Sequence, residues 1–323
     1  MSVPSRDLIW NSDADHATGR HLSKPVVYGL LAYAIVILGA NWPVMATGLR
    51  SITPIWMAAL RIGGAAILVG AVSAVSGNVI VPPRRDLPII ASVAVFRLAI
   101  LMTLVFFALR LLPAGRASVL VWTSALWTVP IAGVFLGEKI SRPKWTGLLV
   151  GLIGVVVISE LWDNDWRQRD VIIGTGLLLT GALVNASTAV HIRRHRWTMT
   201  PSQALPWQLG VASILLTLLA LIVDGVPSIQ WTPQLTLIVL YQAGLATGTA
   251  FWAQIVVLRN LSAVSTNLSM MGIPVIGVVS SIIVLDEQIT FALALGMALV
   301  ITGVSINILS DRQTDDHHTH NRI

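Results

Sequence analysis

The sequence predicts an all-α membrane protein with ten transmembrane helices, arranged as two inverted five-helix repeats. Three observations support this prediction. First, 55% of the 323 residues are hydrophobic and only 11% are charged, whereas soluble domains carry about 25% charged residues. Second, the apolar residues gather in ten runs, each long enough to cross a bilayer. Third, a pattern in the first half of the chain recurs in the second half.

Each apolar run is predicted to be a helix, because lipid cannot satisfy exposed backbone N–H and C=O groups. A closed barrel would also satisfy them, but barrel strands alternate apolar and polar residues. Residues 148–158 are apolar on every side, which argues against a barrel. The predicted spans cover residues 25–47, 54–75, 87–109, 113–136, 144–160, 171–191, 204–223, 234–257, 262–285 and 290–309.

The basic residues predict how the chain is oriented in the membrane. The net charge of +6 is compatible with nucleic-acid binding, but the position of the charges explains it better. With a cytoplasmic N-terminus, fourteen Lys and Arg lie in cytoplasmic segments and five in outer segments, which agrees with the positive-inside rule. We therefore expect a bacterial inner (plasma) membrane protein with both termini in the cytoplasm and no nucleic-acid partner.

The repeat is visible at a constant offset of 149 residues. Seven residue types recur at this offset, among them an Arg, a Glu and two Gly; the pairs are Leu109 and Leu258, Arg110 and Arg259, Ala114 and Ala263, Glu138 and Glu287, Ile140 and Ile289, Gly147 and Gly296, and Gly154 and Gly303. Each half holds five predicted spans. Because five is odd, the second half must be inverted in the membrane, an arrangement suited to alternating access.

The predicted organisation has four parts. A cytoplasmic tail (1–24) precedes the first repeat (25–160), and the second repeat (171–309) is followed by a cytoplasmic tail (310–323). The C-terminal tail holds a histidine cluster, which could bind a metal weakly, but a solvated disordered tail is favoured. The cluster consists of His317, His318 and His320. No metal site and no cofactor are expected, and the chain has no cysteine.

Several sequence elements resemble a known family. These are ALRLLPAGRAS, LGEKI and GLLVGLIGVVVI within residues 107–158, GANWPV at 39–44 and ALRIGGAAILV at 59–69. They are similar to the drug/metabolite transporter superfamily, specifically its ten-helix EamA type. The resemblance implies a carrier that exports amino acids, other metabolites or drugs, without naming the solute. One departure concerns span four, where the family often has Pro near the position of Ala125; the second repeat keeps it as Pro274, and the first has Pro130 instead.

Candidate solute-binding residues are polar or aromatic side chains deep within the predicted spans, because polar groups in a membrane usually face a cavity or another helix. Arg97 lies about ten residues into span three, roughly 15 Å deep, and its planar guanidinium suits a carboxylate. Bonding to a neighbouring helix is the competing interpretation for every one of these residues. The set is Asn41, Trp42, Arg97, Trp122, Asn185, Tyr241 and Gln242.

Other residues in or near the spans have structural interpretations. Arg61 is shallower and is expected to extend toward the interface. Tyr241, Thr249 and Trp252 can share one face of span eight at helical spacing, and they are candidates for hydrogen bonds to a solute, with bonding between helices as the competing interpretation. Glu138 and Glu287 end their spans and are expected to fix loop geometry. Glycines at Gly63-Gly64, Gly147, Gly151, Gly296 and Gly303 are expected to permit close helix packing.

Two classes of function are open to a chain of this kind, a carrier for small organic solutes and a membrane-embedded enzyme that modifies lipid. An enzyme needs titratable groups for acid–base or metal chemistry, and no predicted span interior contains Asp, Glu or His. A carrier is therefore favoured, with export of amino acids or related metabolites ahead of export of drugs or other metabolites. The same absence predicts facilitated diffusion or exchange rather than proton drive. The oligomeric state stays open.

Overall fold

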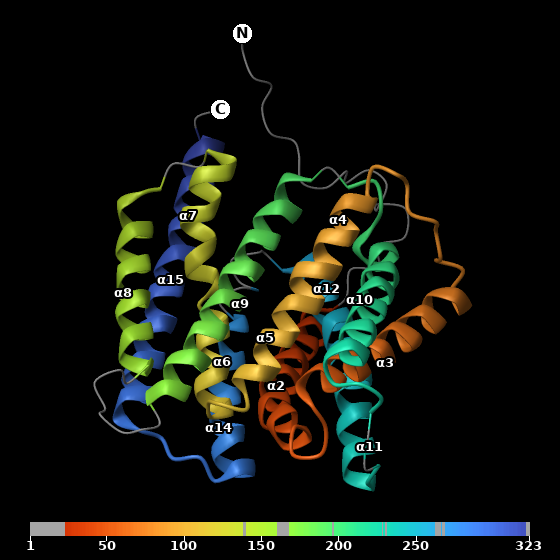
Figure 1. Cartoon of the computed structure of the whole chain (residues 1–323). Coiled ribbons are helices and arrows are strands. Elements are labelled where there is room, and N and C mark those ends of the chain that lie inside the picture. Colours follow the sequence, from red (N-terminus) through yellow and green to blue (C-terminus); the bar gives the residue numbers. More distant parts are fainter. Residues whose placement is uncertain are drawn as a thin grey trace.

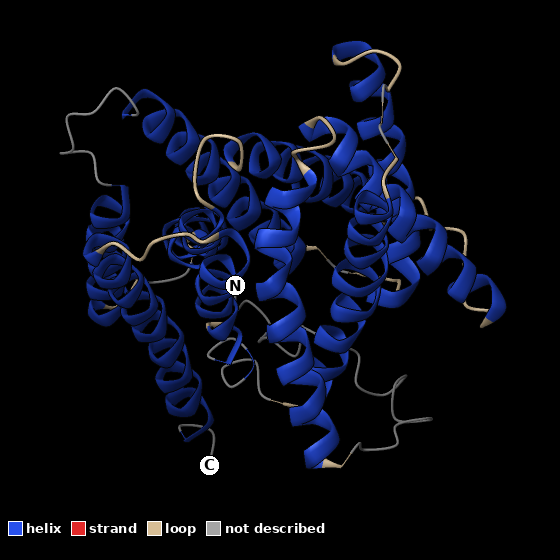
Figure 2. Ribbon diagram, turned by 90° about the horizontal axis from the view of Figure 1, so that it is seen from below, coloured by secondary structure: helices blue, strands red, loops and turns tan. Residues whose placement is uncertain are grey.

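The structure is a computed structural model of the whole chain. It describes residues 23–137, 140–159, 168–195, 197–227, 229, 231–261, 266 and 269–320. Within these ranges the ordered elements are helices, and none of the described residues forms a strand (Figure 2). The predicted all-α class is confirmed.

Eight helical segments in the described part of the chain are long and apolar enough to cross a bilayer. Two further helices, α8 and α14, lie at the predicted positions of spans five and nine but are shorter. The elements are α2 (Lys24–Gly48), α3 (Pro54–Val75), α4 (Leu87–Ser92), η1 (Val93–Ile100), α5 (Leu101–Ala108), α6 (Ala114–Trp122), α7 (Ser124–Leu136), α8 (Arg142–Ser159), α9 (Gln168–Arg194), α10 (Pro201–Val223), α11 (Pro233–Leu240), η2 (Tyr241–Thr249), α12 (Ala250–Asn260), α14 (Gly272–Leu285) and α15 (Phe291–His320).

Threonine followed by proline begins three of these helices. The pairs that start α3, α10 and α11 place Pro at the first helical position, where its missing N–H is no loss. Thr200 and Gln203 form a reciprocal capping box at the start of α10. Thr232 accepts a hydrogen bond from the Leu235 N–H at the start of α11. These local signals explain why the predicted starts of spans two, seven and eight lie so close to the observed ones.

The third and eighth spans each contain a π-helical segment, a rare conformation that occurs often at functional sites. The segments are η1 and η2, and they lie at corresponding positions of the two halves. The fourth span is interrupted at Thr123, between α6 and α7, where the Thr123 hydroxyl donates to the Leu120 carbonyl. The interruption does not coincide with Pro130, which lies within α7.

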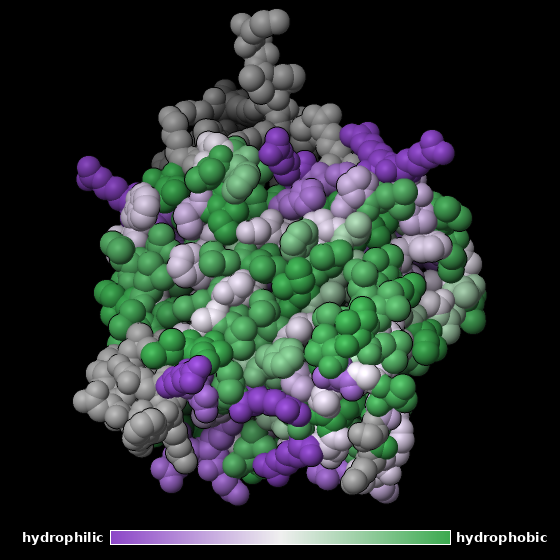
Figure 3. Space-filling view, viewed as in Figure 1, coloured by the Kyte–Doolittle hydropathy of each residue, from purple (hydrophilic) through white to green (hydrophobic). Residues whose placement is uncertain are grey.

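The surface carries a wide apolar band between two polar ends (Figure 3). Large aliphatic residues are exposed on this surface: Val75 is 90% exposed and Ile222 is 81% exposed. An apolar surface of this extent is unfavourable in water but matches the hydrocarbon core of a bilayer. The chain is therefore an integral membrane protein.

Helices α8 and α15 lie side by side at one edge of the molecule (Figure 1). Glycines make this approach possible, because a Cβ at Gly303 would lie 2.5 Å from the Gly147 carbonyl oxygen. The close packing expected of these glycines is confirmed. Helix α15 continues to His320, so the expectation of a disordered tail is wrong for residues 310–320. Once a helix is formed, each further residue adds one backbone hydrogen bond, so the helix can extend beyond the membrane.

Helices α3 and α10 form a second close pair, which is joined at both ends. Trp56, in the first turn of α3, donates to the Gly225 carbonyl just beyond α10. Trp207, in α10, donates to the Ile80 carbonyl beyond α3. An indole with one N–H donor and an apolar face suits such a position, so each helix begins against the end of the other.

Candidate solute-binding site

Three helices contribute to a buried polar cluster around Arg61 in α3. The Arg61 Nε donates to the Thr247 hydroxyl of η2 at 3.0 Å, and one terminal nitrogen lies 3.2 Å from the Met45 sulfur of α2. The Asn41 amide nitrogen contacts the same sulfur at 2.9 Å. Arg61 is only 5% exposed, so the expectation that it extends to the interface is wrong. The neighbouring hydroxyl and sulfur stabilise the guanidinium in place.

Two further candidates belong to the same group of helices. The Tyr241 hydroxyl donates to the Ile37 carbonyl of α2 at 2.8 Å. The Gln242 amide nitrogen is 3.6 Å from the Met57 sulfur of α3. The structure therefore brings Asn41, Tyr241 and Gln242 to the interface of α2, α3 and η2. The carbonyl oxygens of Asn41 and Gln242 are buried and have no hydrogen-bond donor among the described residues, which leaves two acceptors for an incoming group.

Arg97 occupies η1, in the middle of the third span. Its side chain is partly exposed, and η1 packs against α9 and α10. In the part of the chain that the structure describes, the Arg97 guanidinium makes no hydrogen bond or ion pair. A guanidinium has five N–H donors and keeps its charge.

The remaining candidates lie elsewhere in the fold. Trp42 is buried and faces α14, where a Cβ at Gly277 would lie 3.2 Å from its ring. Trp122 ends α6 and packs against buried apolar residues of the protein core. The Asn185 amide in α9 donates to the Ser124 hydroxyl in α7 at 3.2 Å. These contacts are between helices, and no direct bond joins the three residues to Arg61 or Arg97 among the described residues.

The π-helical turn of η2 changes which residues share a face. The predicted face of Tyr241, Thr249 and Trp252 assumed α-helical spacing, which does not hold here. Gln242 is fully buried, whereas Trp252 is 57% exposed. The prediction is therefore wrong for Trp252, whereas Tyr241 and Thr249 both form hydrogen bonds to α2 and Gln242 points into the protein.

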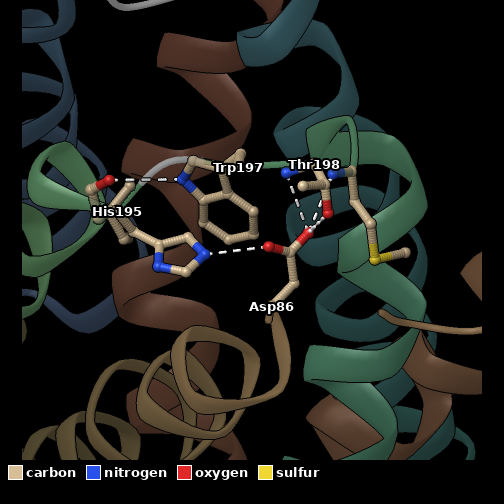
Figure 4. A network of polar contacts seen from close by, with 6 residues as sticks. Asp86, His195, Trp197 and Thr198 are labelled. Carbon is tan, nitrogen blue, oxygen red and sulfur yellow. Dashed lines mark hydrogen bonds and ion pairs between the residues drawn. The ribbon is translucent and has the colours of Figure 1, made fainter. Parts of the chain in front are cut away.

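Asp86 is the centre of a polar network that the sequence did not predict (Figure 4). Its side chain is fully buried, just before α4. One carboxylate oxygen accepts from the Thr198 N–H, the Thr198 hydroxyl and the Met199 N–H, at 3.1, 2.6 and 3.0 Å. The other oxygen lies 3.0 Å from the His195 Nε2. The network ties the loop after α9 to the start of the third span.

Burial of Asp86 opposes its ionisation, but the hydrogen bonds from Thr198, His195 and Met199 outweigh it and hold the pKa of the carboxyl below its ordinary value. A single acidic residue beside two arginines, directly before a span, was the only sequence signal of this network. Its partners come from a loop more than a hundred residues away, so they could not be predicted.

Glu287 lies just beyond α14 and bonds to the start of α6. Its two carboxylate oxygens accept from the Ala114 N–H at 2.6 Å and the Gly115 N–H at 2.9 Å. This agrees with the structural role expected for Glu287. The matching Glu138 lies outside the described residues.

Comparison with known proteins identifies relatives of this chain. The EamA-like transporter family matches residues 26–160 and 172–309. A protein of Escherichia coli K12 named "Probable amino-acid metabolite efflux pump" is 26% identical over 299 residues, which are 88% of this chain and 95% of that protein. The uncharacterized transporter YoaV of Bacillus subtilis is 24% identical over 284 residues, covering 87% and 96%. One crystal structure superposes with a TM-score of 0.62 at 18% identity, covering 90% of this chain and 99% of that chain, which is a likeness of fold.

Proposed function

This chain belongs to the EamA-like transporter family, within the drug/metabolite transporter superfamily, and we propose that it exports amino acids or related metabolites by alternating access. As a member of this family the chain is a membrane transporter and not an enzyme. The efflux-pump relatives support export as the direction.

The proposed architecture has ten spans, formed by a first repeat over 25–160 and an inverted second repeat over 171–309, with both termini cytoplasmic. The family match in two separate ranges supports it, as do the corresponding positions of η1 and η2. Contacts at the span ends are consistent with it as well. Asp86 bonds to Thr198 where both loops are assigned to the cytoplasm, and Glu287 bonds to Ala114 where both are assigned to the outside.

The observation that carries the solute class is the guanidinium of Arg97, which has no hydrogen bond or ion pair among the residues that the structure describes. A charged group at mid-span is costly unless it is compensated. A carboxylate-bearing solute would supply the negative charge that compensates the guanidinium, through paired N–H···O contacts. The free acceptors on Asn41 and Gln242 suit a donor such as an ammonium or amide group. The proposed solute-contacting residues are Asn41, Trp42, Arg97, Trp122, Asn185, Tyr241 and Gln242.

The test is counterflow in proteoliposomes that contain the purified protein. Vesicles are loaded with a mixture of unlabelled amino acids, and uptake of each radiolabelled amino acid is measured. Competition by amino acids is compared with competition by their carboxamides, which lack the carboxylate charge. We expect Arg97→Gln to reduce the difference between the two competitor sets at least tenfold, since one lost charge-assisted contact corresponds to about that factor.

Two controls make the result specific. Arg97→Lys keeps the charge and should keep part of the discrimination. Arg50→Gln removes an exposed arginine from the loop between α2 and α3 and should change nothing. Equal losses for acids and carboxamides in Arg97→Gln would show that Arg97 is structural. Uptake of apolar cationic drugs without any amino-acid counterflow would instead support a drug exporter.

A further inference from the structure

The loop between α3 and α4 lies against the first turns of α10. The Gln203 amide nitrogen donates to the Asn78 side-chain oxygen at 3.3 Å, and the Trp207 indole N–H donates to the Ile80 carbonyl at 2.9 Å. Helix α10 begins at Pro201, so Trp207 is about 9 Å farther along the helix axis. The loop therefore runs beside the second turn of α10 and does not end above the helix.

Three consecutive apolar residues of this loop are exposed. Val79, Ile80 and Val81 are 51%, 46% and 78% exposed, and a continuous apolar row of this kind is unfavourable in water. Residues 79–81 belong to no helix or strand, and the hydrocarbon core cannot satisfy the N–H and C=O groups of such a segment. The headgroup layer between water and hydrocarbon satisfies both requirements. We therefore place the loop at the level of the lipid headgroups.

Exposed arginines lie next to this loop on two segments that are far apart in the sequence. They are Arg84, Arg85 and Arg194. Asp86 follows the first two and His195 follows the third, and these two side chains meet at 3.0 Å (Figure 4). A second contact, between the Ser92 hydroxyl and the His191 ring at 3.0 Å, joins the same two segments. The start of the third span and the end of α9 thus present their arginines side by side.

The two segments carry a net positive charge. The sequence has one acidic residue, Asp86, between residues 76 and 92 and none between residues 190 and 203. Asp86 is fully buried, and its carboxylate already accepts three hydrogen bonds from the loop after α9. It is therefore not available to the exposed arginines. The anion that abounds at the headgroup level is phosphate, and a guanidinium binds phosphate through two parallel N–H···O bonds.

We propose that the loop 79–85 and the end of α9 form a binding site for an anionic phospholipid of the surrounding bilayer. The apolar residues 79–81 contact the acyl chains close to the headgroup, and the three arginines bind the phosphate. Basic clusters beside a membrane span attract anionic lipids in this way. The Asp86 network holds the two arginine-bearing segments together, so one lipid can contact both.

Lipid binding is measured by native mass spectrometry of the purified protein in detergent, titrated with phosphatidylglycerol or with phosphatidylcholine of the same acyl chains. We expect Arg84→Gln combined with Arg85→Gln to weaken binding of phosphatidylglycerol by about tenfold or more, because each basic residue near an anionic membrane surface contributes roughly a factor of five. Binding of phosphatidylcholine should not change. Arg50→Gln combined with Arg169→Gln is the matched control, since it removes two exposed arginines elsewhere, and it should alter neither titration.

A second measurement tests where the loop lies. The sequence contains no cysteine, so Val81→Cys carries a single nitroxide label after reconstitution in bilayers. Oxygen, which dissolves in lipid, should relax this label more strongly than a water-soluble nickel chelate does.

Four results would overturn the proposal. They are stronger relaxation by the nickel chelate, equal binding of the two lipids by the natural protein, equal losses in the two double variants, and displacement of phosphatidylglycerol by equimolar glycerol phosphate, which would indicate a site for a soluble phosphate. Neither measurement needs a transported solute, so the results do not depend on which solute is carried.

Discussion

Asp86 and His195 meet at 3.0 Å, carboxylate oxygen to ring nitrogen, and so connect the start of the third span to the loop after the sixth. The carboxylate is fully buried and also accepts three bonds from Thr198 and Met199. It therefore fixes the path of a loop that contains only a few residues between α9 and α10.

Asp86→Asn should lower the stability of the protein by about 1.5–3 kcal/mol at neutral pH, because charge-assisted bonds are weakened in a buried site. The measurement is thermal unfolding in detergent. Asp224→Asn is the control, since Asp224 is exposed and its carboxylate accepts one hydrogen bond from the described residues, that of the Thr53 hydroxyl. Comparable losses of thermal stability in the two variants would contradict a larger stabilising contribution from the buried Asp86.

Acid pH should remove the stabilisation that the ionised Asp86 carboxylate contributes to the folded protein. The pKa of Asp86 is lower in the folded protein than its ordinary value, which is about 3.9 in an unfolded chain. The stabilisation is therefore fully present above about pH 4 and is lost as the pH falls through the folded-state pKa. Unfolding temperatures measured between pH 3 and pH 7 should show a steeper acid decline for the natural protein than for Asp86→Asn. Parallel curves would refute this linkage.

Thr247→Val should weaken the Arg61 cluster. The change removes the oxygen that accepts from Arg61 Nε but keeps the shape of the side chain, and a bond to a charged group contributes about 1.5–3 kcal/mol. A double-mutant cycle with Arg61→Met checks the assignment, because Thr247→Val should cost little once the guanidinium is gone. Additive effects of the two changes would mean that this bond contributes nothing.

Gly303→Ala should destabilise the α8–α15 pair by about 1–3 kcal/mol. The new methyl group would meet the Gly147 carbonyl oxygen and the Gly151 nitrogen, at 2.5 and 2.6 Å, and neither is a flexible side-chain end. Gly210→Ala in α10 is the matched control, since a Cβ there meets nothing within 4 Å. Thermal unfolding in one detergent compares the two variants. An unchanged midpoint for Gly303→Ala would argue against close packing at this crossing.

Solute flux should not require a proton gradient. The acidic residues lie in the tails, the loops and at span ends, where they are poorly placed for a relay through the membrane. Proteoliposomes with and without an imposed pH gradient should reach the same final solute ratio. Accumulation well above equilibrium, driven by the gradient alone, would disprove facilitated diffusion or exchange and make Glu138 and Glu287 the first relay candidates.

Hydropathy was sufficient to predict most of the fold, because the thickness of the bilayer fixes how long an apolar helix must be. The predicted second and seventh spans begin within a few residues of Pro54 and Pro201, where the observed helices begin. The apolar runs start near these positions, and a Thr-Pro pair is a strong signal for the start of a helix. The π-helical segments could not be predicted, since no local residue pattern distinguishes them from an α-helix. The misassigned face of Trp252 follows directly from that.

A residue of the candidate site could be predicted only where its depth within a transmembrane span was sufficient evidence. Arg97 is deep in its span whatever its neighbours are, so its position alone made it a candidate. Arg61 was misjudged because its partners, Met45 and Thr247, come from two other helices, one of them 186 residues away. The bond between Asn185 and Ser124 likewise depends on how α9 packs on α7, which sequence spacing cannot give.

Helix α15 has 30 residues, which corresponds to about 45 Å of helix, while the hydrocarbon core is about 30 Å thick. The helix therefore exceeds the apolar layer by roughly 15 Å, and its last turns form a stalk at the C-terminus. A fluorescent protein joined directly to His320 would begin about 15 Å beyond the apolar layer. Such a fusion offers a fluorescence readout of C-terminal orientation and, through polarisation, of tilting of the α8–α15 pair during turnover.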